Sequence, residues 1–374
     1  MSSMHKKKFS KPLPYRVCGN SYPINTVAKQ LREELRPLMQ RRLPTVYFSG
    51  FKHGYIINLI KKYKQTHSYF LKLDIKKYYP SVPHQTIILQ AQLAYRDLLA
   101  KRAVPKTFKQ KYLPSIVSFT EQHPAHYGIP LGNSMSSVLA PLVFVPMLLQ
   151  LKKQSIPFIV FADDILLFAT SKKESQSLYF YIIQELSNMG LEINTAKMCS
   201  GKIATIPFTF CGWAIQGGYY GVCKSKVNAF KTKLSLQCNT RKAMPLRAQI
   251  KRVNQIICGF GHYYKYGNVS KLFSVLDSYI RQQLRTWMKQ QNLPYVKNTQ
   301  LTNMGLKSLS SLLKGKTTQL PKAEQIINAV LHTKNKQQKE LPLLADMLEL
   351  QQTLVNQNKE IIAQLKKLNS ALQM

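Results

Sequence analysis

Acidic residues are scarce in this chain. Only 16 Asp and Glu stand against 54 Lys and Arg among 374 residues, which gives a formal net charge of +38. A field of that size attracts polyanions and opposes self-association. Nucleic acid is therefore the first partner to consider, with an anionic membrane surface second. Each of the few carboxylates, in turn, needs an explanation.

Long apolar segments and paired cysteines are also missing. The longest apolar run, "VLAPLVFVPMLLQL", is shorter than the roughly 20 residues of a membrane-spanning helix and contains prolines. The basic start "MSSMHKKKFSKPLPYR" leads into no apolar core, so it does not resemble a secretory signal. The six cysteines form no Cys-x-x-Cys pair, which favours a reducing compartment. We therefore expect a cytoplasmic protein without membrane association.

Two of the few carboxylates are adjacent. Asp163 and Asp164 stand in "FADDILLFA", between runs rich in branched and aromatic residues, which predicts a β-hairpin with the pair near its tip. Taken alone, such a pair is more often a turn than a metal site, because Asp side chains hydrogen-bond the nearby backbone of turns. The pair indicates a metal site only if other carboxylates join it.

A third carboxylate, Asp74, stands alone in the strand predicted within "YFLKLDIKKYYPSVPH". The order of strand, helices, hairpin, helix and strand predicts an α+β fold with helices against one face of an antiparallel sheet. The Asp74 strand can then lie beside the hairpin, so that three carboxylates meet at one edge. Such a cluster needs cations, and two divalent ions about 3.5–4 Å apart are the usual solution in phosphoryl transfer. Alternatively, Asp74 merely pairs with Lys76 or Lys77.

Composition and hydrophobic periodicity divide the chain into regions. We expect a basic N-terminal region (1–68), a central region (69–223) with a helical insertion at about 85–125, a basic helical region (224–291), a basic connector (292–340) and an amphipathic tail (341–374).

The tail has the pattern of a coiled coil. From Leu344 to Leu372 apolar residues recur at alternating spacings of three and four, with Asn358 in the seam. A polar residue in such a seam fixes the register of association at some cost in stability. We therefore expect a homo-oligomer formed through 344–372. The alternative is a helix that docks on the chain's own body.

Six segments occur in the order and spacing of the motifs of a known family. They are "YFSGFKHGYIINLI", "LDIKKYYPSVPH", "GIPLGNSMSS", "FADD", "GLEINTAKM" and "FCGW". The chain resembles prokaryotic reverse transcriptases, the group that includes group II intron, diversity-generating and defence-associated enzymes. Further along, "RVNQIICGFGHYYKYGNVSKLFSVLDSYIRQQLRTWMKQQ" resembles the thumb of group II intron maturases. The resemblance covers about residues 45–290. It implies a right-hand polymerase with fingers, an antiparallel palm sheet and a helical thumb, followed here by the coiled-coil-like tail.

The resemblance implies roles for the carboxylates. Asp74 and Asp163 match the two metal-binding aspartates, and Asp164 matches the second member of the doublet, whose ligation is often less direct. The backbone carbonyl of Ile75 would complete a site for two Mg²⁺ ions, for which Mn²⁺ is a possible substitute. Lys197 matches the lysine proposed to protonate the leaving pyrophosphate, with a solvated surface lysine as the alternative.

Other matched residues would contact the nucleotide. Tyr79 stands where the family places an aromatic ring under the sugar, which would exclude a ribose 2′-hydroxyl; an ordinary core tyrosine is the alternative. Many reverse transcriptases have Gln where this chain has Leu131, followed by Gly132. Diversity-generating and defence-associated enzymes share this apolar replacement, which argues against a conventional intron maturase.

Basic residues and a hairpin would hold the substrates. A triphosphate needs cations, for which Arg16, Lys52 and Lys72 are candidates. The resemblance assigns the primer grip, a hairpin that holds the primer end, to Phe210, Gly212 and Trp213. Cations of the predicted thumb would follow a duplex backbone with salt-dependent affinity. These cations are Lys265, Lys271, Arg281, Arg285 and Lys289. The apolar residues predicted to share the buried face of the same helix are Phe273, Leu276, Ile280 and Leu284.

These features together predict an RNA-directed DNA polymerase that uses two-metal nucleotidyl transfer. The expected partners are deoxynucleoside triphosphates, an RNA template, the DNA product and a dedicated structured non-coding RNA. Antiphage defence is the favoured setting, ahead of diversity generation. Two alternatives stay open: a template-independent or diversity-generating DNA polymerase on the same palm, and a non-catalytic RNA-binding protein of the maturase kind.

Overall fold

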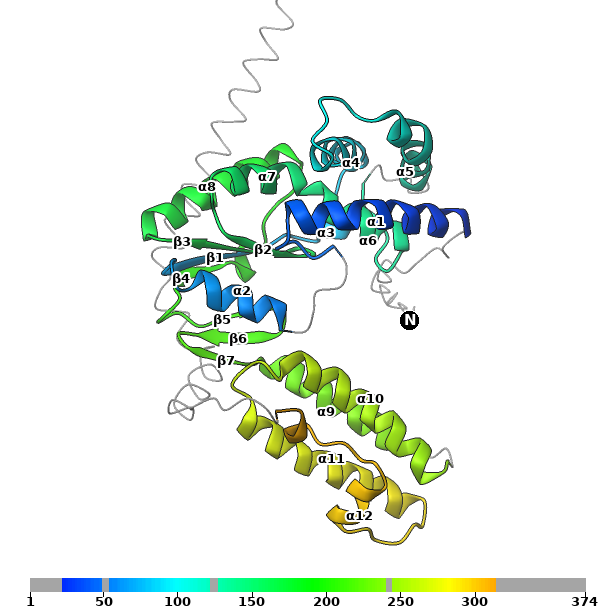
Figure 1. Ribbon diagram of the computed structural model, residues 1–374. Helices are drawn as coiled ribbons and strands as arrows, with labels where there is room; N and C mark the ends of the chain where they lie inside the picture. Colours follow the sequence, from blue (N-terminus) through cyan, green and yellow to red (C-terminus); the bar gives the residue numbers. More distant parts are fainter. Residues whose placement is uncertain (1–21, 49–53, 122–126, 240–243, 314–374) are drawn as a thin grey trace, which may run out of the picture. The chain divides into compact units, whose positions relative to one another are not determined.

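The structure is a computed structural model that divides into two units, Met1–Thr317 and Thr318–Met374. All elements described below belong to the first unit (Figure 1). The described residues are 22–48, 54–121, 127–239 and 244–313. The predicted tail helix at 344–372 lies outside them.

A four-stranded antiparallel sheet carries the carboxylates, with the strand order β2-β3-β1-β4. The strands are β1 (Tyr69–Asp74), β2 (Phe158–Phe161), β3 (Asp164–Ala169) and β4 (Cys199–Lys202). As the sequence predicts, the β2–β3 hairpin lies beside the strand of Asp74. The register sets Asp74, the last residue of β1, directly opposite Asp164, the first residue of β3. Both carboxylates therefore lie at one edge of the sheet.

Helices precede, interrupt and follow the strands of this sheet. They are α1 (Tyr22–Arg42), α2 (Tyr55–Tyr63), α3 (Tyr78–Ser81), α4 (His84–Leu98), a π-helical turn (Phe108–Tyr112) that leads into α5 (Leu113–Glu121), α6 (Ser134–Val143), α7 (Val145–Lys153) and α8 (Lys172–Asn188). The segment Ser134–Lys153 has the length and composition of a membrane span. However, 72% of its most apolar stretch is buried inside the protein, as in a core helix.

The two faces of the sheet pack differently because successive side chains of a strand point to opposite sides. Phe70, Lys72 and Asp74 share one face of β1. On that face Phe70 and Phe168 belong to a core that includes α2 and a second sheet. Helix α8 packs against β1 and β3 on the other face (Figure 1). The expectation of helices against one face was therefore incomplete, since the second face is also covered.

The second sheet is three-stranded and antiparallel. Its strands are β5 (Phe208–Phe210), β6 (Trp213–Gln216) and β7 (Tyr219–Val222). The predicted turn at Gly217-Gly218 joins β6 to β7. A turn of the same length joins β5 to β6, with φ of 49° at Cys211 and 81° at Gly212. Two-residue hairpins of type I′ need positive φ at both central residues, which glycine adopts at little cost.

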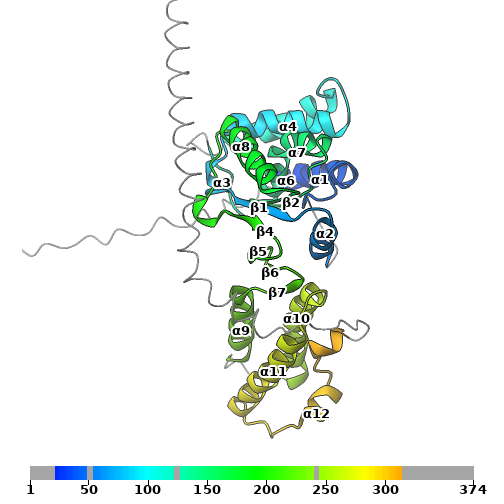
Figure 2. The ribbon, with the colours of Figure 1, turned by 90° about the vertical axis from the view of Figure 1, so that its left-hand side faces the viewer.

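A helical region follows the second sheet. It contains α9 (Lys224–Cys238), α10 (Leu246–Tyr264) and α11 (Ser270–Gln290), which lie side by side (Figure 2). The predicted buried face of α11 is confirmed, because Phe273, Leu276, Ile280 and Leu284 are at most 1% exposed. The described part of the predicted connector, which follows Gln291, contains regular structure. That part forms α12 (Asn298–Asn303) and a 3₁₀ turn (Ser310–Leu313).

Asp277 anchors the segment that follows α12. Its carboxylate is 5% exposed and accepts hydrogen bonds from the Leu309 amide at 2.6 Å and the Ser310 amide at 3.0 Å. The Ser308 hydroxyl donates a third bond at 3.0 Å. Gly261 of α10 permits the close approach, because a Cβ there would lie 2.9 Å from a methyl carbon of Leu309.

The helical region also supports the β5–β6 turn. The Trp213 ring lies 5.8 Å from that of Tyr263 and 5.0 Å from that of Tyr264, measured between centroids. The Tyr263 hydroxyl donates a hydrogen bond to the Cys211 carbonyl at 2.9 Å. The turn is therefore fixed by side chains that come from α10.

Candidate active site

A cavity of about 500 Å³ lies where β1 ends. Three segments border it: the end of β1 with the residues after it, the β2–β3 turn and the segment after α8. The lining residues are Asp74, Ile75, Lys76, Lys77, Asp163, Ile193, Asn194, Thr195 and Lys197. The structure thus brings together two of the three carboxylates, the carbonyl-bearing residue and the lysine that the sequence singles out.

Backbone hydrogen bonds position the two carboxylates. Asp74 ends β1, and its carbonyl accepts a bond from the Asn194 amide at 2.7 Å. The Asp163 carbonyl accepts one from the Ile75 amide at 3.3 Å, in a turn where Ala162 has a φ of 54°. A non-glycine residue in this left-handed region is strained, and such strain clusters at functional sites. The strained turn holds Asp163 beside the end of β1.

The Asp74 carboxylate pairs with Lys197. The lysine Nζ lies 3.3 Å and 3.1 Å from the two carboxylate oxygens. Asp74 is 6% exposed, whereas the Lys197 side chain is 61% exposed on a 3₁₀ turn (Thr195–Lys197). An exposed ammonium on a flexible stem can swing away, which would leave Asp74 available to another cation. The role of Lys197 as a general acid stays a prediction.

The third carboxylate, Asp164, pairs with Lys72 and does not border the cavity. The Lys72 Nζ lies 3.5 Å from its Oδ1. Burial raises the pKa of the Asp164 carboxyl, while the charge of Lys72 opposes that rise. Burial also raises the pKa of Asp163, and the neighbouring charges of Asp164 and Asp74 add to the effect. Negative charge is therefore crowded at this edge, and the two lysines offset part of it.

The oxygen donors that line the cavity suit a hard cation such as Mg²⁺. Two carboxylates line it, where the sequence predicted three. Among the described residues, no group of three or more His, Cys, Asp or Glu is placed to hold a metal ion. The three carboxylates do lie at one edge of the sheet, but Asp164 pairs with Lys72, and only Asp74 and Asp163 border the cavity. Mg²⁺, however, prefers oxygen ligands and uses one or two protein carboxylates with waters and substrate phosphates. Asp74, Asp163 and the carbonyl of Ile75 supply such ligands.

Tyr79 lies near this cavity and is tied to the loop that precedes α6. Its carbonyl accepts a hydrogen bond from the Ile129 amide at 2.8 Å. Burial raises the pKa of Tyr79, and the charge of Asp163 contributes to the rise. Leu131 in the same loop is 60% exposed, and Gly132 has a φ of 86°. The loop thus presents an apolar side chain to solvent where many relatives have an amide.

Of the three proposed triphosphate cations, only Lys72 lies within the described residues. Lys72 is 14% exposed and engaged with Asp164, so it is not available to a triphosphate. It lies on the Asp74 face of β1 because the two residues are two positions apart in a strand. Lys52 and Arg16 lie outside the described residues.

The hairpin predicted as the primer grip is present as β5 and β6, and its role stays a prediction. Phe210 and Trp213 are each 1% exposed, so their side chains belong to the core. The turn of this hairpin, Cys211-Gly212, is partly buried. A Cβ at Gly212 would lie 2.5 Å from the Tyr264 hydroxyl, so the turn is packed against α10. Any contact with a primer would come from the backbone of this turn.

The predicted duplex-binding cations divide into two groups. In the first group, Lys271 and Lys289 are exposed. Arg281 donates a hydrogen bond to the Ser278 hydroxyl at 3.0 Å, and Lys265 lies over the ring of Tyr266. Arg285, in contrast, has a structural task. It donates two hydrogen bonds to the Val296 carbonyl, both at 3.3 Å, and one to Asn298 at 2.5 Å. Its expected role on a duplex backbone is therefore not supported.

Two polar residues of the cavity, Asn194 and Thr195, were missed by sequence reasoning; they belong to the segment "GLEINTAKM". Lys76 and Lys77 also line the cavity, but the sequence suggested them only as partners of Asp74, and Lys76 pairs with Glu192 instead. The motif in which Asn194 and Thr195 lie was noted, but only its lysine was assigned a role. The signal that could have found them is their position three and two residues before that lysine.

Comparison with known families identifies the class of protein. Residues 9–215 match the family described as Reverse transcriptase (RNA-dependent DNA polymerase). Because this match covers more than half of the chain, the protein belongs to the reverse transcriptase family. Its fold is that of a right-hand polymerase, with the four-stranded sheet as the palm. Residues 227–299 match the group II intron, maturase-specific domain. We refer to the helical region 224–313 as the thumb.

Similar folds occur among solved structures of telomerase. Apo telomerase from Candida tropicalis has a TM-score of 0.44 and 12% identity, over 87% of this chain and 60% of that chain. Telomerase from Candida albicans in complex with a TWJ fragment of telomeric RNA has a TM-score of 0.40 and 12% identity, over 83% and 57%. The chain thus spans 57–60% of the length of these two structures. No curated protein matches the sequence.

Proposed function

We propose that this protein is an RNA-directed DNA polymerase that extends a primer with deoxynucleotides. The observation that carries the proposal is the cavity at the end of β1, where Asp74 and Asp163 lie together with Lys197. Membership of the reverse transcriptase family supports it. In the reaction the primer 3′-hydroxyl oxygen bonds to the α-phosphorus of the triphosphate, and pyrophosphate leaves.

The residues of the cavity have separate tasks in this proposal. Asp74, Asp163 and the carbonyl of Ile75 would hold two Mg²⁺ ions, or Mn²⁺ in their place. When bound, such ions would activate the hydroxyl and neutralise phosphate charge. Lys197 releases Asp74 and donates a proton to the leaving pyrophosphate. Tyr79 lies under the sugar, where its ring excludes a ribose 2′-hydroxyl.

Basic residues and the second sheet complete the proposed substrate contacts. The exposed cations of the thumb follow the template–product duplex, with an affinity that falls as salt rises. Leu131 and Gly132 lie against the incoming nucleotide, and the backbone at Gly212 lies near the primer end. The partners in this scheme are an RNA template, deoxynucleoside triphosphates and the DNA product.

The biological setting we propose is antiphage defence in the cytoplasm of a prokaryotic cell, with a dedicated structured non-coding RNA. The resemblance of "GIPLGNSMSS" to defence-associated enzymes supports this setting, as does the net charge of +38. The match at 227–299 favours a second candidate, an RNA-binding protein that acts in the manner of a maturase. Sequencing of the RNA that co-purifies with the protein would separate a single dedicated RNA from an intron.

Self-association is a further part of the proposal. The heptad pattern at 344–372 lies outside the described residues, so its support comes from the sequence. Light scattering of RNA-free protein should give the mass of an oligomer, and deletion of 344–372 should give that of a monomer. A full-length chain that is monomeric at micromolar concentration would favour a tail that docks on its own body.

Primer extension tests the central proposal. Wild-type protein, Asp163→Asn and Glu192→Gln are compared on an RNA template with Mg²⁺ and all four deoxynucleotides. Glu192 is the matched control, since it is an exposed carboxylate close to the cavity that pairs with Lys76. We expect extension by wild type and Glu192→Gln, and a loss of about a thousandfold in Asp163→Asn.

The products of the same assay separate the alternatives. DNA made equally well without a template indicates untemplated synthesis. Extension by Asp163→Asn at the wild-type rate would refute the assignment of the site. No extension by any variant, with RNA binding intact, would favour the maturase-like candidate.

A further inference from the structure

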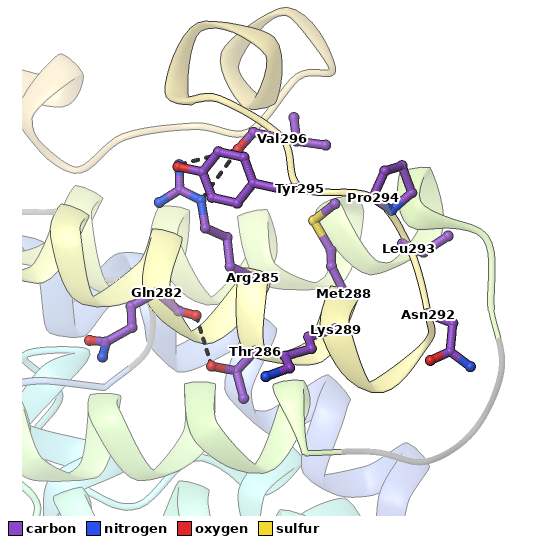
Figure 3. Close-up of a pocket in the computed structure, with 10 residues that line it drawn as sticks. All are labelled: Gln282, Arg285, Thr286, Met288, Lys289, Asn292, Leu293, Pro294, Tyr295 and Val296. Carbon is purple, nitrogen blue, oxygen red and sulfur yellow. Dashed lines mark hydrogen bonds between the residues drawn. The ribbon is translucent and has the colours of Figure 1, made fainter.

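The thumb has a second cavity, far along the chain from the palm carboxylates. It has a volume of about 700 Å³ and opens between the C-terminal turns of α11 and the loop before α12 (Figure 3). Exposed polar and aromatic side chains border it, among them Lys289, Asn292 and Tyr295. Its volume falls within the range of roughly 300–1,000 Å³ found for ligand sites.

An arginine and a tyrosine form a fixed platform in this cavity. The Arg285 guanidinium lies 5.0 Å from the centre of the Tyr295 ring. The guanidinium cannot turn freely, because it is hydrogen-bonded to the Val296 carbonyl and to Asn298. Figure 3 shows the guanidinium against the tyrosine ring. Tyr295 remains 74% exposed, so the ring has a free surface on which a flat group can stack.

Polar groups beside the platform are available to a ligand. The side chains of Gln282, Lys289 and Asn292 are exposed and make no hydrogen bond with the described part of the chain. Amides both donate and accept hydrogen bonds, as the edge of a nucleobase requires, and an ammonium group suits a phosphate. The Thr286 hydroxyl, in contrast, is bonded to the Gln282 carbonyl at 3.1 Å.

The charge of the helical region that contains the cavity favours a polyanion. From Leu246 to Leu313 the chain has ten cations, and its one acid, Asp277, is buried and hydrogen-bonded. The cations are Arg247, Lys251, Arg252, Lys265, Lys271, Arg281, Arg285, Lys289, Lys297 and Lys307. An exposed aromatic ring within a basic surface is the arrangement that binds single-stranded nucleic acid.

We propose that this cavity binds an unpaired nucleobase of an RNA strand, with Tyr295 as the stacking surface. RNA is favoured over DNA because a reverse transcriptase receives its RNA with unpaired bases, whereas it makes DNA paired to the template. Stacking tolerates any base, so the site would recognise an unpaired position and not a sequence. The inference rests on the proposed binding of RNA and is independent of the chemistry at Asp74 and Asp163.

Stacking can be measured with a short unstructured RNA that carries a fluorescent adenine analogue, whose emission falls when the base stacks. Titration of this probe should show quenching by wild-type protein and by Tyr295→Phe, which keeps the ring. Tyr295→Ala should lose the quenching and bind about 5- to 150-fold more weakly. The matched control is Tyr279→Ala, which removes a ring of the same helical region that also lies against a cation, Lys231. It should behave as wild type.

Three results would overturn the proposal. One is that Tyr295→Ala, with a melting temperature equal to that of wild type, quenches the probe as strongly as wild type does. Another is an equal loss in Tyr279→Ala, which would make the effect a general one of basic aromatic surface. The third is equal binding of a DNA strand with the same analogue, which would remove the assignment to RNA. Asp163→Asn should keep the quenching, so a failure of the polymerase proposal would not be mistaken for a failure of this one.

Discussion

Asp74 in the palm and Asp277 in the thumb are almost equally buried, at 6% and 5% exposed, but their partners differ. Asp277 accepts hydrogen bonds from two backbone amides and a hydroxyl, all fixed by the fold. The charge partner of the Asp74 carboxylate within the described residues is Lys197, whose side chain is 61% exposed. A buried carboxylate with fixed donors holds a structure together. One whose partner can leave is free to bind a cation.

The same difference extends to the surroundings of the two residues. In the palm, burial and neighbouring negative charge raise the pKa of Asp163. Crowding of this kind costs stability, which is common at functional sites. Asp277 is the sole acid of the thumb between Leu246 and Leu313, so no like charge opposes it. The crowded carboxylates of the palm therefore lower the stability of the fold, whereas the hydrogen-bonded Asp277 of the thumb contributes to it.

The largest expected effect is on activity in Asp74→Asn. The amide keeps the shape of the side chain but loses the charge that would hold a divalent ion, so the rate of deoxynucleotide incorporation should fall by about a thousandfold. The urea midpoint should change little, because the partner of Asp74 is an exposed lysine. Incorporation within tenfold of wild type would make Asp74 a structural residue like Asp277.

The converse change is Asp277→Ala, which should lower the free energy of unfolding by about 3 kcal/mol. It leaves the amides of Leu309 and Ser310 without their acceptor. Chemical denaturation measures this loss, and incorporation per folded molecule at low temperature should remain that of wild type. Unchanged stability would contradict the view that Asp277 anchors the segment after α12.

Tyr79→Ala should have a smaller effect, on the choice of sugar. Removal of the ring predicted to block the 2′-hydroxyl should raise the incorporation of ribonucleotides relative to deoxynucleotides by about tenfold. Tyr79→Phe, which keeps the ring, is the control and should retain the wild-type ratio. If the two variants give the same ratio, Tyr79 is an ordinary half-buried tyrosine of the palm.

Lys72→Met should have the smallest effect. It removes the partner of Asp164 and should lower the free energy of unfolding by about 1 kcal/mol, while Lys72→Arg should recover most of the loss. The KM for deoxynucleotides should not change, because Lys72 is engaged with Asp164 and does not face a triphosphate. A rise of KM by an order of magnitude would restore its original assignment as a triphosphate ligand.

Sequence reasoning predicted the strand of Asp74, the hairpin of Asp163 and their adjacency, because alternation and turn chemistry are local signals. The sequence also indicated that Lys72 lies on the same face of its strand as Asp74, because residues two positions apart in a strand share a face. That position places Lys72 beside the carboxylates, where it pairs with Asp164. The burial of Trp213 could not be read from its motif, because a motif match gives a position in a family and not the exposure of a side chain. Arg285 is hydrogen-bonded to the Val296 carbonyl and to Asn298. These residues lie more than ten positions further along the chain, and no local pattern predicts that contact.

Direct measurement of metal binding tests the central claim about the palm. Electron paramagnetic resonance of Mn²⁺ can count the bound ions in the presence of a primer–template duplex and a non-hydrolysable deoxynucleoside triphosphate. We expect bound Mn²⁺ with wild type and with Glu192→Gln, and at least one ion fewer, or about tenfold weaker binding, with Asp163→Asn. Equal Mn²⁺ binding by wild type and Asp163→Asn would contradict the claim that these carboxylates form the metal site.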